Sequence, residues 1–285
     1  MGLRIQNNVE AFNAHRQLTG TAAKAASSME KLSSGYRINR AADDAAGLAI
    51  SEKMRGQIGG LAQAQRNAQD GISLVQTAEG ALNEVHSMLQ RVRDLSTQFK
   101  NGTLSSDDKD AIAAEVFQIA GEVKNISDQT KFNGNSLLGS ATFTFQVGAN
   151  DSETVATTAT VFSGAIGSAG TGGLSELTGL SSAAQVKTAL DTGVLANIST
   201  VDNAIKNVSN ARSQLGAVQN RLEHRLNNLA TYQENLVASE SRIRDVDMAK
   251  EMTSFTKLNI LQQAGTSMLA QANQAPQNIL SLLRQ

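Results

Sequence analysis

The sequence predicts a mainly helical protein, in which long helices pack as an antiparallel bundle and carry a small β insert. The first observation is a heptad-like apolar stripe along residues 61–99. The second is composition: the 285 residues include no tryptophan and only 4% aromatic residues, which disfavours a bulky globular core. The third is an alternation of apolar and polar residues at 142–147, which is typical of a half-buried strand.

The stripe along residues 61–99 defines one long helix. Its members recur every three or four positions, and none carries a charge: Leu61, Ala64, Ala68, Gly71, Val75, Ala78, Leu82, Val85, Leu89, Val92, Ser96 and Phe99. At about 1.5 Å per residue this helix would be roughly 58 Å long, so partners of similar length are needed to cover it. We expect it over residues 57–100.

The chain before this helix predicts another helix, a connector and a short helical stretch. The first helix lies within residues 1–34 and has a narrow apolar stripe, with an earlier part slightly out of phase: Ile5, Val9, Phe12, then Leu18, Ala22, Ala25, Met29 and Leu32. Gly35 is placed to end it. Helical composition resumes at 45–54, before three glycines at 56, 59 and 60 loosen it.

Four charged residues in the connector have two interpretations. Arg37, Arg40, Asp43 and Asp44 could form a catalytic cluster, or they could belong to a solvated or subunit-contact turn. No histidine or second nucleophile accompanies them, so we favour the turn. The two aspartates also lie where they could stabilise the start of the next helix.

Two more helices can accompany the long one. Ser105 or Ser106 can cap a helix over 107–127, which would form an antiparallel hairpin with the long helix. A further long pattern runs from Ile198 to Leu236 and includes Arg225 and Tyr232 in its stripe. Charged residues on and just after this helix are interpreted as solvated surface charge: Glu223, Arg225, Arg242, Arg244, Asp245 and Asp247.

The insert between these helices predicts a hairpin and loops. Phe143, Phe145 and Val147 alternate with polar residues, Gly148–Asp151 can reverse the chain, and a second strand is expected at 155–162. Much of 163–192 is rich in Gly, Ser and Thr, with one short helix expected near 182–190. The insert should rest on the helices and be exposed at the surface.

The last segment, residues 258–283, contains no charged residue. Its length fits a membrane span, but Asn and Gln at 259, 262, 263, 271, 273, 274, 277 and 278 disfavour one. We therefore expect no membrane insertion and instead burial among other protein helices, through a stripe of Leu258, Leu261, Gly265, Met268, Ala272, Ala275, Ile279 and Leu282. Both ends of the chain would then be assembly surfaces.

Charge and composition limit the function further. The net charge of −1 gives no electrostatic basis for binding nucleic acid. The absence of cysteine excludes disulfides and thiolate metal sites, and the histidines at 15, 86 and 224 are interpreted as ordinary side chains, so no metal or cofactor is expected. The first residues lack an ordinary secretory signal, which predicts another export route if the protein leaves the cell.

Four segments resemble bacterial flagellin closely and in the same order. They are residues 32–50 (LSSGYRINRAADDAAGLAI), 67–84 (NAQDGISLVQTAEGALNE), 215–222 (LGAVQNRL) and 261–274 (LQQAGTSMLAQANQ). The resemblance covers roughly residues 1–140 and 196–285. It implies a subunit that polymerises into the filament for swimming motility, with a hook–filament junction or other axial protein as the alternative.

The resemblance also implies a division of the chain and a set of partners. Residues 1–42 and 246–285 would form a terminal coiled coil in the filament core, 43–140 and 196–245 a helical bundle, and 141–195 a variable surface insert. Expected partners are further copies of the chain, a flagellar export chaperone on the C-terminal helix, and the filament cap and hook-junction proteins. Export would use the flagellar type III apparatus. The expected core-assembly residues are Ile5, Val9, Phe12, Leu18, Met29, Leu32, Leu258, Leu261, Met268, Leu269, Ile279 and Leu282.

Many flagellins are recognised by a host Toll-like receptor, and the matching positions here are Arg91, Leu95 and Glu115. Asp94 replaces the usual glutamate, and Ser96-Thr97 are more polar than the usual pair. The same residues could instead serve subunit packing. An enzymatic insert is disfavoured, because the metalloprotease found in some flagellins needs His-Glu-x-x-His and residues 141–195 contain no histidine.

Overall fold

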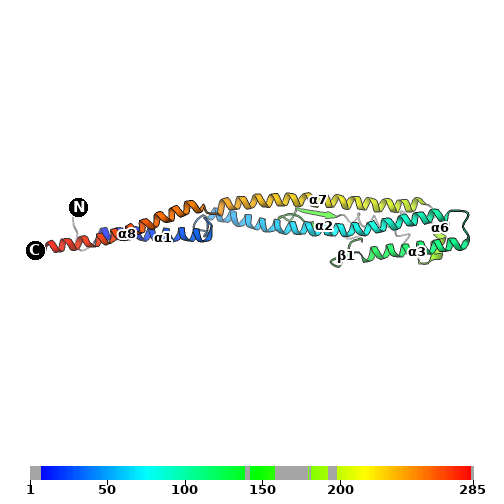
Figure 1. Ribbon diagram of the computed structural model, residues 1–285, viewed down its shortest axis with the longest axis horizontal. Coiled ribbons are helices and arrows are strands. Elements are labelled where there is room, and N and C mark those ends of the chain that lie inside the picture. Colours follow the sequence, from blue (N-terminus) through cyan, green and yellow to red (C-terminus); the bar gives the residue numbers. More distant parts are fainter. Residues whose placement is uncertain (1–7, 139–141, 158–178, 180, 192–197, 284–285) are drawn as a thin grey trace. The chain divides into compact units, whose positions relative to one another are not determined.

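The computed structural model confirms a mainly helical chain (Figure 1). It describes residues 8–138, 142–157, 179, 181–191 and 198–283, and the side chains of the last helix through residue 274. Its helices are α1 (Val9–Ser34), α2 (Ala45–Phe99), α3 (Ser106–Gln129), α6 (Ala183–Asp191), α7 (Ile198–Arg244) and α8 (Met248–Leu283). Its strands form two antiparallel pairs, β1 (Lys131–Phe132) with β2 (Asn135–Ser136) and β3 (Phe143–Gln146) with β4 (Thr154–Thr157).

The chain divides into two compact units. The terminal unit consists of Met1–Gly56 and Asn235–Gln285, and the bundle unit consists of Gln57–Glu234. The first residues of α2 and the last residues of α7 therefore belong to the terminal unit. The finer three-part division expected from the sequence stays a prediction.

The predicted stripe of the long helix forms the core of the bundle unit. Every stripe residue from Leu61 to Phe99 is buried. One apolar cluster joins α2 to α7 and the β hairpins, and a second joins α2 to α3, α6 and Val201. In Figure 1, α2 and α7 run side by side, as their shared cluster requires.

One sequence-based expectation about α2 is wrong. The glycines at 56, 59 and 60 do not divide it, and a single helix runs from Ala45 to Phe99. A helical glycine costs only about 1 kcal/mol relative to alanine, and burial of the stripe outweighs that. Gly60 also has a packing role, because a Cβ there would lie 3.2 Å from the Cβ of Ala149.

The β3–β4 hairpin rests on α2 and α7, as the alternation predicts. Phe145 pairs with Val155, and Val155 and Val147 are buried in the first cluster. The Asn67 side chain on α2 donates a hydrogen bond to the Gln146 carbonyl at 3.0 Å. Strand β4 ends at Thr157, and residues 158–162 of the predicted strand lie outside the described residues.

Helices α3, α6 and α7 begin or pack close to their predicted positions. Ser105 caps α3, and α6 places Val186 and Leu190 in the second cluster. On α7, however, Arg225 and Tyr232 are exposed, although both were assigned to the stripe. The buried register instead passes from Leu222 through half-buried Leu226 to Leu229, because a straight helix has 3.6 residues per turn and drifts from a strict heptad spacing.

Candidate assembly surface

In the terminal unit, α1 packs along α8 in antiparallel orientation. At one end the Asn8 side chain donates a hydrogen bond to the Ala272 carbonyl at 2.7 Å, and at the other Tyr36 and Asp245 form a β-bridge. Between these points the residues partly or fully withdrawn from solvent recur at heptad spacing. Those at this spacing are Ala11, Ala14, Leu18, Thr21, Ala25, Ser28 and Leu32 on α1, and Glu251, Phe255, Leu258, Gln262, Gly265, Leu269 and Ala272 on α8; Ala22, Lys31 and Asn259 are also partly withdrawn and lie beside them. We call these residues the seam.

The seam is made mostly of small and polar side chains. A Cβ built on Gly265 would lie 3.2 Å from Leu18 Cδ1, so the two helices approach closely there. Small residues permit such an approach but bury little apolar area, and hydrophobic stabilisation scales with that area. The seam therefore uses only part of the apolar side chains that α1 and α8 carry.

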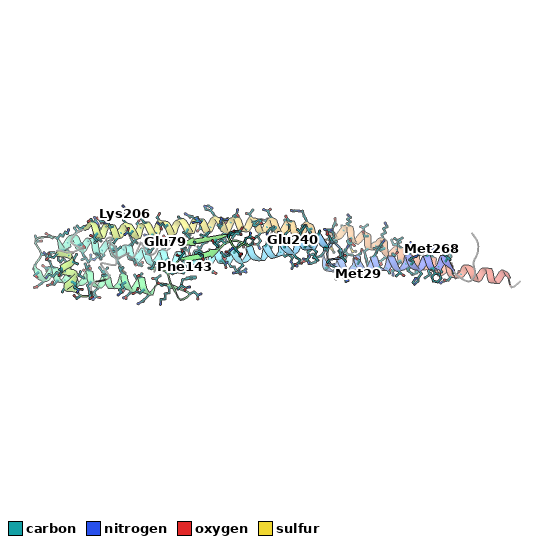
Figure 2. All side chains as sticks on the ribbon, turned by 180° about the vertical axis from the view of Figure 1, so that it is seen from behind. Met29, Glu79, Phe143, Lys206, Glu240 and Met268 are labelled. Carbon is teal, nitrogen blue, oxygen red and sulfur yellow. The ribbon has the colours of Figure 1, made fainter. Side chains whose placement is uncertain are left out.

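The remaining large apolar side chains lie outside the seam and face solvent. We call them the free apolar face: Val9, Phe12 and Met29 on α1, and Met248, Met252, Ile260, Leu261 and Met268 on α8. Phe12 is 69% exposed and Met268 62%, and Figure 2 labels Met29 and Met268. Met252, Ile260 and Leu261 line a shallow groove along α8, together with Thr253, Thr256 and Lys257.

The free apolar face distinguishes the terminal unit from the bundle. Within the described part of the chain, Tyr232 is the one strongly exposed large apolar residue that belongs to the bundle unit. Exposed apolar side chains gathered over neighbouring elements mark surfaces that other proteins cover. The terminal unit is therefore the candidate association surface.

The predicted core-assembly residues fall into two groups. Val9, Phe12, Met29, Leu261 and Met268 belong to the free apolar face, whereas Leu18, Leu32, Leu258 and Leu269 belong to the seam. Ile5 lies outside the described residues, and Ile279 and Leu282 belong to α8 without described side chains. Their roles in assembly stay predictions.

Sequence reasoning missed three members of this face, Ile260, Met252 and Met248. It followed one apolar stripe along α8 and assumed one covered side. Ile260 and Met252 fall outside the spacing of that stripe, and Met248 lies before its first residue, Leu258, so a survey of every apolar residue between 248 and 268 would have found them.

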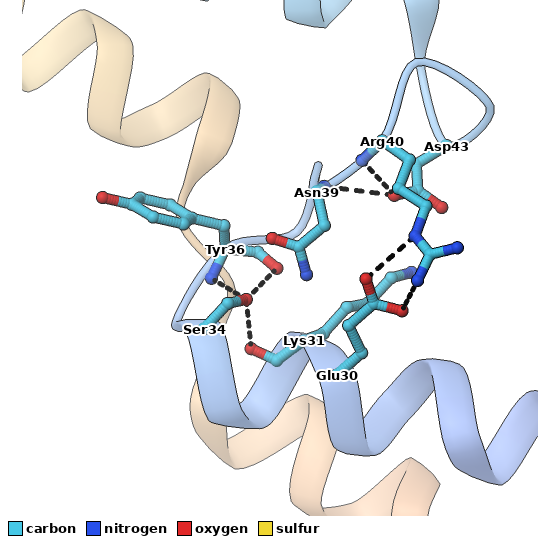
Figure 3. Close-up of polar contacts among 7 residues, drawn as sticks. All are labelled: Glu30, Lys31, Ser34, Tyr36, Asn39, Arg40 and Asp43. Atoms are coloured by element: carbon cyan, nitrogen blue, oxygen red, sulfur yellow. Dashed lines mark hydrogen bonds and ion pairs between the residues drawn. The ribbon is translucent and has the colours of Figure 1, made fainter.

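The charged connector is structural (Figure 3). Asp43 Oδ2 accepts hydrogen bonds from the backbone N–H groups of Arg40 at 3.0 Å and Asn39 at 3.1 Å. These bonds hold the pKa of Asp43 below its ordinary value.

The other charged residues of the connector also have structural partners. Arg40 pairs with Glu30. Asp44 accepts a hydrogen bond from the Gly47 N–H at 2.8 Å and therefore caps the start of α2. Among the described residues, no three His, Asp or Glu side chains are placed to hold a metal ion.

The three predicted receptor contacts differ in accessibility. Arg91 and Glu115 form an exposed ion pair between α2 and α3 at 2.7 Å. Leu95 is only 2% exposed and packs in the second cluster, so it supports this surface from below. Their role in recognition stays a prediction.

The uncharged stretch of α8 is not apolar enough to cross a bilayer, and the same holds for every other helix within the described residues. The amide side chains that disfavoured a membrane span lower its average hydropathy.

Comparison with known proteins is consistent with this geometry. A family model for the bacterial flagellin N-terminal helical region matches residues 5–142, and one for the C-terminal helical region matches residues 198–283. Flagellin of Halalkalibacterium halodurans is 51% identical over 283 residues, which cover 98% of this chain and 99% of that protein. Flagellin of Bacillus subtilis is 49% identical over 304 aligned residues, which cover 99% and 100% of the two chains.

A crystal structure of Bacillus cereus flagellin is 30% identical and has a TM-score of 0.44, covering 57% of this chain and 88% of that chain. Both full-length relatives above are flagellins, which supports a filament subunit and not the junction alternative. This chain therefore belongs to the bacterial flagellins, the structural, non-enzymatic proteins that polymerise as subunits of the extracellular flagellar filament.

Proposed function

We propose that the terminal unit forms the core of this filament and that its free apolar face makes the subunit contacts. The observation that carries the proposal is the concentration of exposed large apolar side chains on α1 and α8. Covering such a face stabilises an assembly by about 25 cal/mol per Å² of apolar surface. Because each subunit would contact many neighbouring copies, a modest free energy per contact is sufficient to hold the filament together.

A single charge on this face tests the proposal. Leu261, which is 46% exposed, tolerates aspartate in the isolated chain but would bring an unpaired carboxylate into a covered contact. We expect Leu261→Asp to abolish seeded filament growth, measured by sedimentation and negative-stain electron microscopy. Leu269→Asp should also block growth, because it places a charge in the seam.

The matched control is Asn220→Asp, which adds the same charge at an exposed position of α7 in the bundle unit. It should grow filaments as the parent chain does. Circular dichroism should show that Leu261→Asp keeps its helices. Normal filaments from Leu261→Asp would refute the assignment of α8 to the core.

We further propose that an export chaperone covers α8 before assembly and that the chain leaves through the flagellar type III apparatus. The support is again the exposed groove of Met252, Ile260 and Leu261, which invites premature association if it stays uncovered in the cytoplasm. The filament cap and the hook-junction proteins would meet the same terminal helices at the two ends of the filament.

Recognition by a host Toll-like receptor is proposed for the surface around Arg91 and Glu115. Both side chains are accessible and lie on neighbouring helices. The buried side chain of Leu95 would act by holding α2 against α3 beneath them.

A further inference from the structure

Methionine supplies half of the free apolar face. Four of its eight residues are methionines, which we call the face methionines: Met29 on α1, 53% exposed, and Met248, Met252 and Met268 on α8, 49%, 49% and 62% exposed. The whole chain has seven methionines. Of the others that the structure describes, Met54 is half-buried, and Met88 is half-buried against the first apolar cluster. The exposed thioethers therefore gather on the surface that carries the proposed subunit contacts.

The thioether sulfur is the atom of this chain that mild oxidants attack most readily. The chain has neither cysteine nor tryptophan, so no thiol or indole competes for the oxidant. Hydrogen peroxide transfers one oxygen atom to the sulfur: the S–O bond forms, the O–O bond breaks and water leaves. The sulfur is oxidised by two electrons and the peroxide is reduced. The product, methionine sulfoxide, is polar, so oxidation converts an apolar contact residue into a hydrogen-bond acceptor.

The face methionines are accessible to an oxidant before the chain assembles. None of them belongs to the seam, so the pairing of α1 with α8 leaves them uncovered. A chain in which the two helices are apart does not cover them either. Their access to solvent is therefore independent of the state of the terminal helices before assembly.

The groove along α8 illustrates why a sulfoxide fits this face poorly. Met252 lines the groove, and the neighbouring hydroxyl groups of Thr253 and Thr256 already donate to carbonyls one turn earlier in α8, at 2.9 and 2.8 Å. Each hydroxyl has a single proton, so neither can donate to a sulfoxide oxygen as well. Lys257 also lines the groove, but it could donate only if its ammonium group were buried in the contact. Covering an oxidised Met252 therefore costs free energy that covering the thioether does not.

We infer that the face methionines are an oxidation site that decides whether a chain can assemble: the reduced thioethers permit entry into the filament, and sulfoxides at these positions exclude the chain. This inference rests on the proposed function, because the face matters only if other copies cover it. The exclusion is reversible, since methionine sulfoxide reductases return both sulfoxide epimers to the thioether.

A partly oxidised population tests the inference without any substitution. The full, unassembled chain is treated with dilute hydrogen peroxide until oxidised and reduced chains coexist, and the peroxide is removed. Filaments are grown on isotope-labelled, reduced seeds and sedimented, so that peptides from the seeds are told apart by mass. Mass spectrometry then gives the sulfoxide fraction at each methionine in the pellet and in the supernatant.

Sulfoxide at the face methionines should be depleted in the pellet about tenfold or more, because a polar atom in a covered apolar contact weakens it. Equal sulfoxide fractions in the pellet and the supernatant would overturn the inference. Repair of the oxidised protein with the two classes of methionine sulfoxide reductase and a thiol reductant should restore growth. Growth that stays lost after the sulfoxides are removed would also overturn it, because other damage would then be the cause.

A chain with leucine at the four positions is the matched variant. Leucine keeps the apolar character and nearly the volume of methionine. The chain carrying Met29→Leu, Met248→Leu, Met252→Leu and Met268→Leu should grow filaments as the parent does and should continue to grow after the peroxide dose that stops the parent. The control is Met88→Leu, which removes a methionine outside the face and should leave the parent's sensitivity unchanged.

Loss of growth by the leucine chain at the same peroxide dose would contradict the inference, because the sensitive residue would then lie elsewhere. If the leucine chain fails to grow without peroxide, the comparison of pellet and supernatant decides the question. A failure of the proposed function is distinguishable, because Leu261→Asp would then grow normal filaments. A failure of this inference alone leaves Leu261→Asp inactive while oxidised chains enter filaments at the parent rate.

Discussion

At the scale of single residues, the same residue type has opposite roles in different surroundings. Arg40 pairs with Glu30 at the surface, where both side chains are exposed and an ion pair contributes little. Arg244 is largely covered and pairs with Glu52 on α2. The two residues are of the same type, and their different burial distinguishes the pair that stabilises the fold from the one that contributes little.

The capping box of α3 allows a residue-scale prediction about acid stability. Ser105 Oγ accepts from the Asp108 N–H at 3.2 Å, and Asp108 Oδ2 accepts from the Ser105 hydroxyl at 2.8 Å and its N–H at 3.0 Å. These hydrogen bonds, the hydroxyl's first, lower the pKa of Asp108. A lowered folded-state pKa means that the stabilisation is present above the ordinary carboxyl value and is lost as pH falls through the folded pKa.

We expect Ser105→Ala to lower the stability of the bundle by about 1 kcal/mol at neutral pH. The pKa of Asp108 should rise toward its ordinary value, which NMR titration would measure. The difference in melting temperature between the variant and the parent should shrink as the pH falls through the lowered pKa of Asp108, because the carboxylate then becomes protonated in both. Thr103→Ala, an exposed change just before the cap, is the control. An Asp108 pKa unchanged by Ser105→Ala would contradict this account.

At the scale of elements, helices far apart in sequence complete each other's cores. The short helix α6 belongs to the insert, yet it packs on α3 through Val186 and Leu190, and its Lys187 forms an ion pair with Asp110. Although α6 was predicted to lie on the surface, it covers one side of the second cluster. The insert is therefore part of the bundle's stability and not only an appendage.

We expect Leu190→Ala, at a position that is 3% exposed, to destabilise the bundle by about 2–5 kcal/mol. The cause is the loss of buried contacts and the cavity left beside α3. Denaturant unfolding monitored by circular dichroism would measure the change. Ala184→Ser, on the exposed side of the same helix, should be nearly neutral. If both changes have the same small effect, α6 does not contribute to the core.

At the scale of the whole molecule, the bundle unit contains the stabilising core and the terminal unit carries the exposed apolar surface proposed for association. Both described apolar clusters lie in the bundle unit, whereas nearly all strongly exposed large apolar residues described in the structure lie in the terminal unit. A chain with its core in one unit and its uncovered face in another can fold the first before it assembles through the second.

Removing residues 1–40 and 247–285 tests this division. The shortened chain should keep a cooperative thermal transition, because both apolar clusters remain intact. It should form no filaments after salt-induced reassembly with seeds, as judged by negative-stain electron microscopy, while the full chain forms long uniform ones. Filaments from the shortened chain would place the polymerising contacts in the bundle unit instead.

The sequence by itself determined which segments are helical, though not that residues 45–99 form one helix, and it determined the β3–β4 hairpin and the buried side of α2. Local periodicity is sufficient for these, because a stripe such as Leu61–Phe99 can be covered only if it faces other helices. Motif resemblance added the family. The tertiary structure alone decided which side of α1 and α8 faces the seam, since both helices carry apolar residues on more than one side and nothing local chooses between them. The tertiary structure also decided that Arg244 is largely buried. Its partners Glu52 and Tyr36 are distant in sequence, so only the folded chain brings them beside the charge that they cover and pair with.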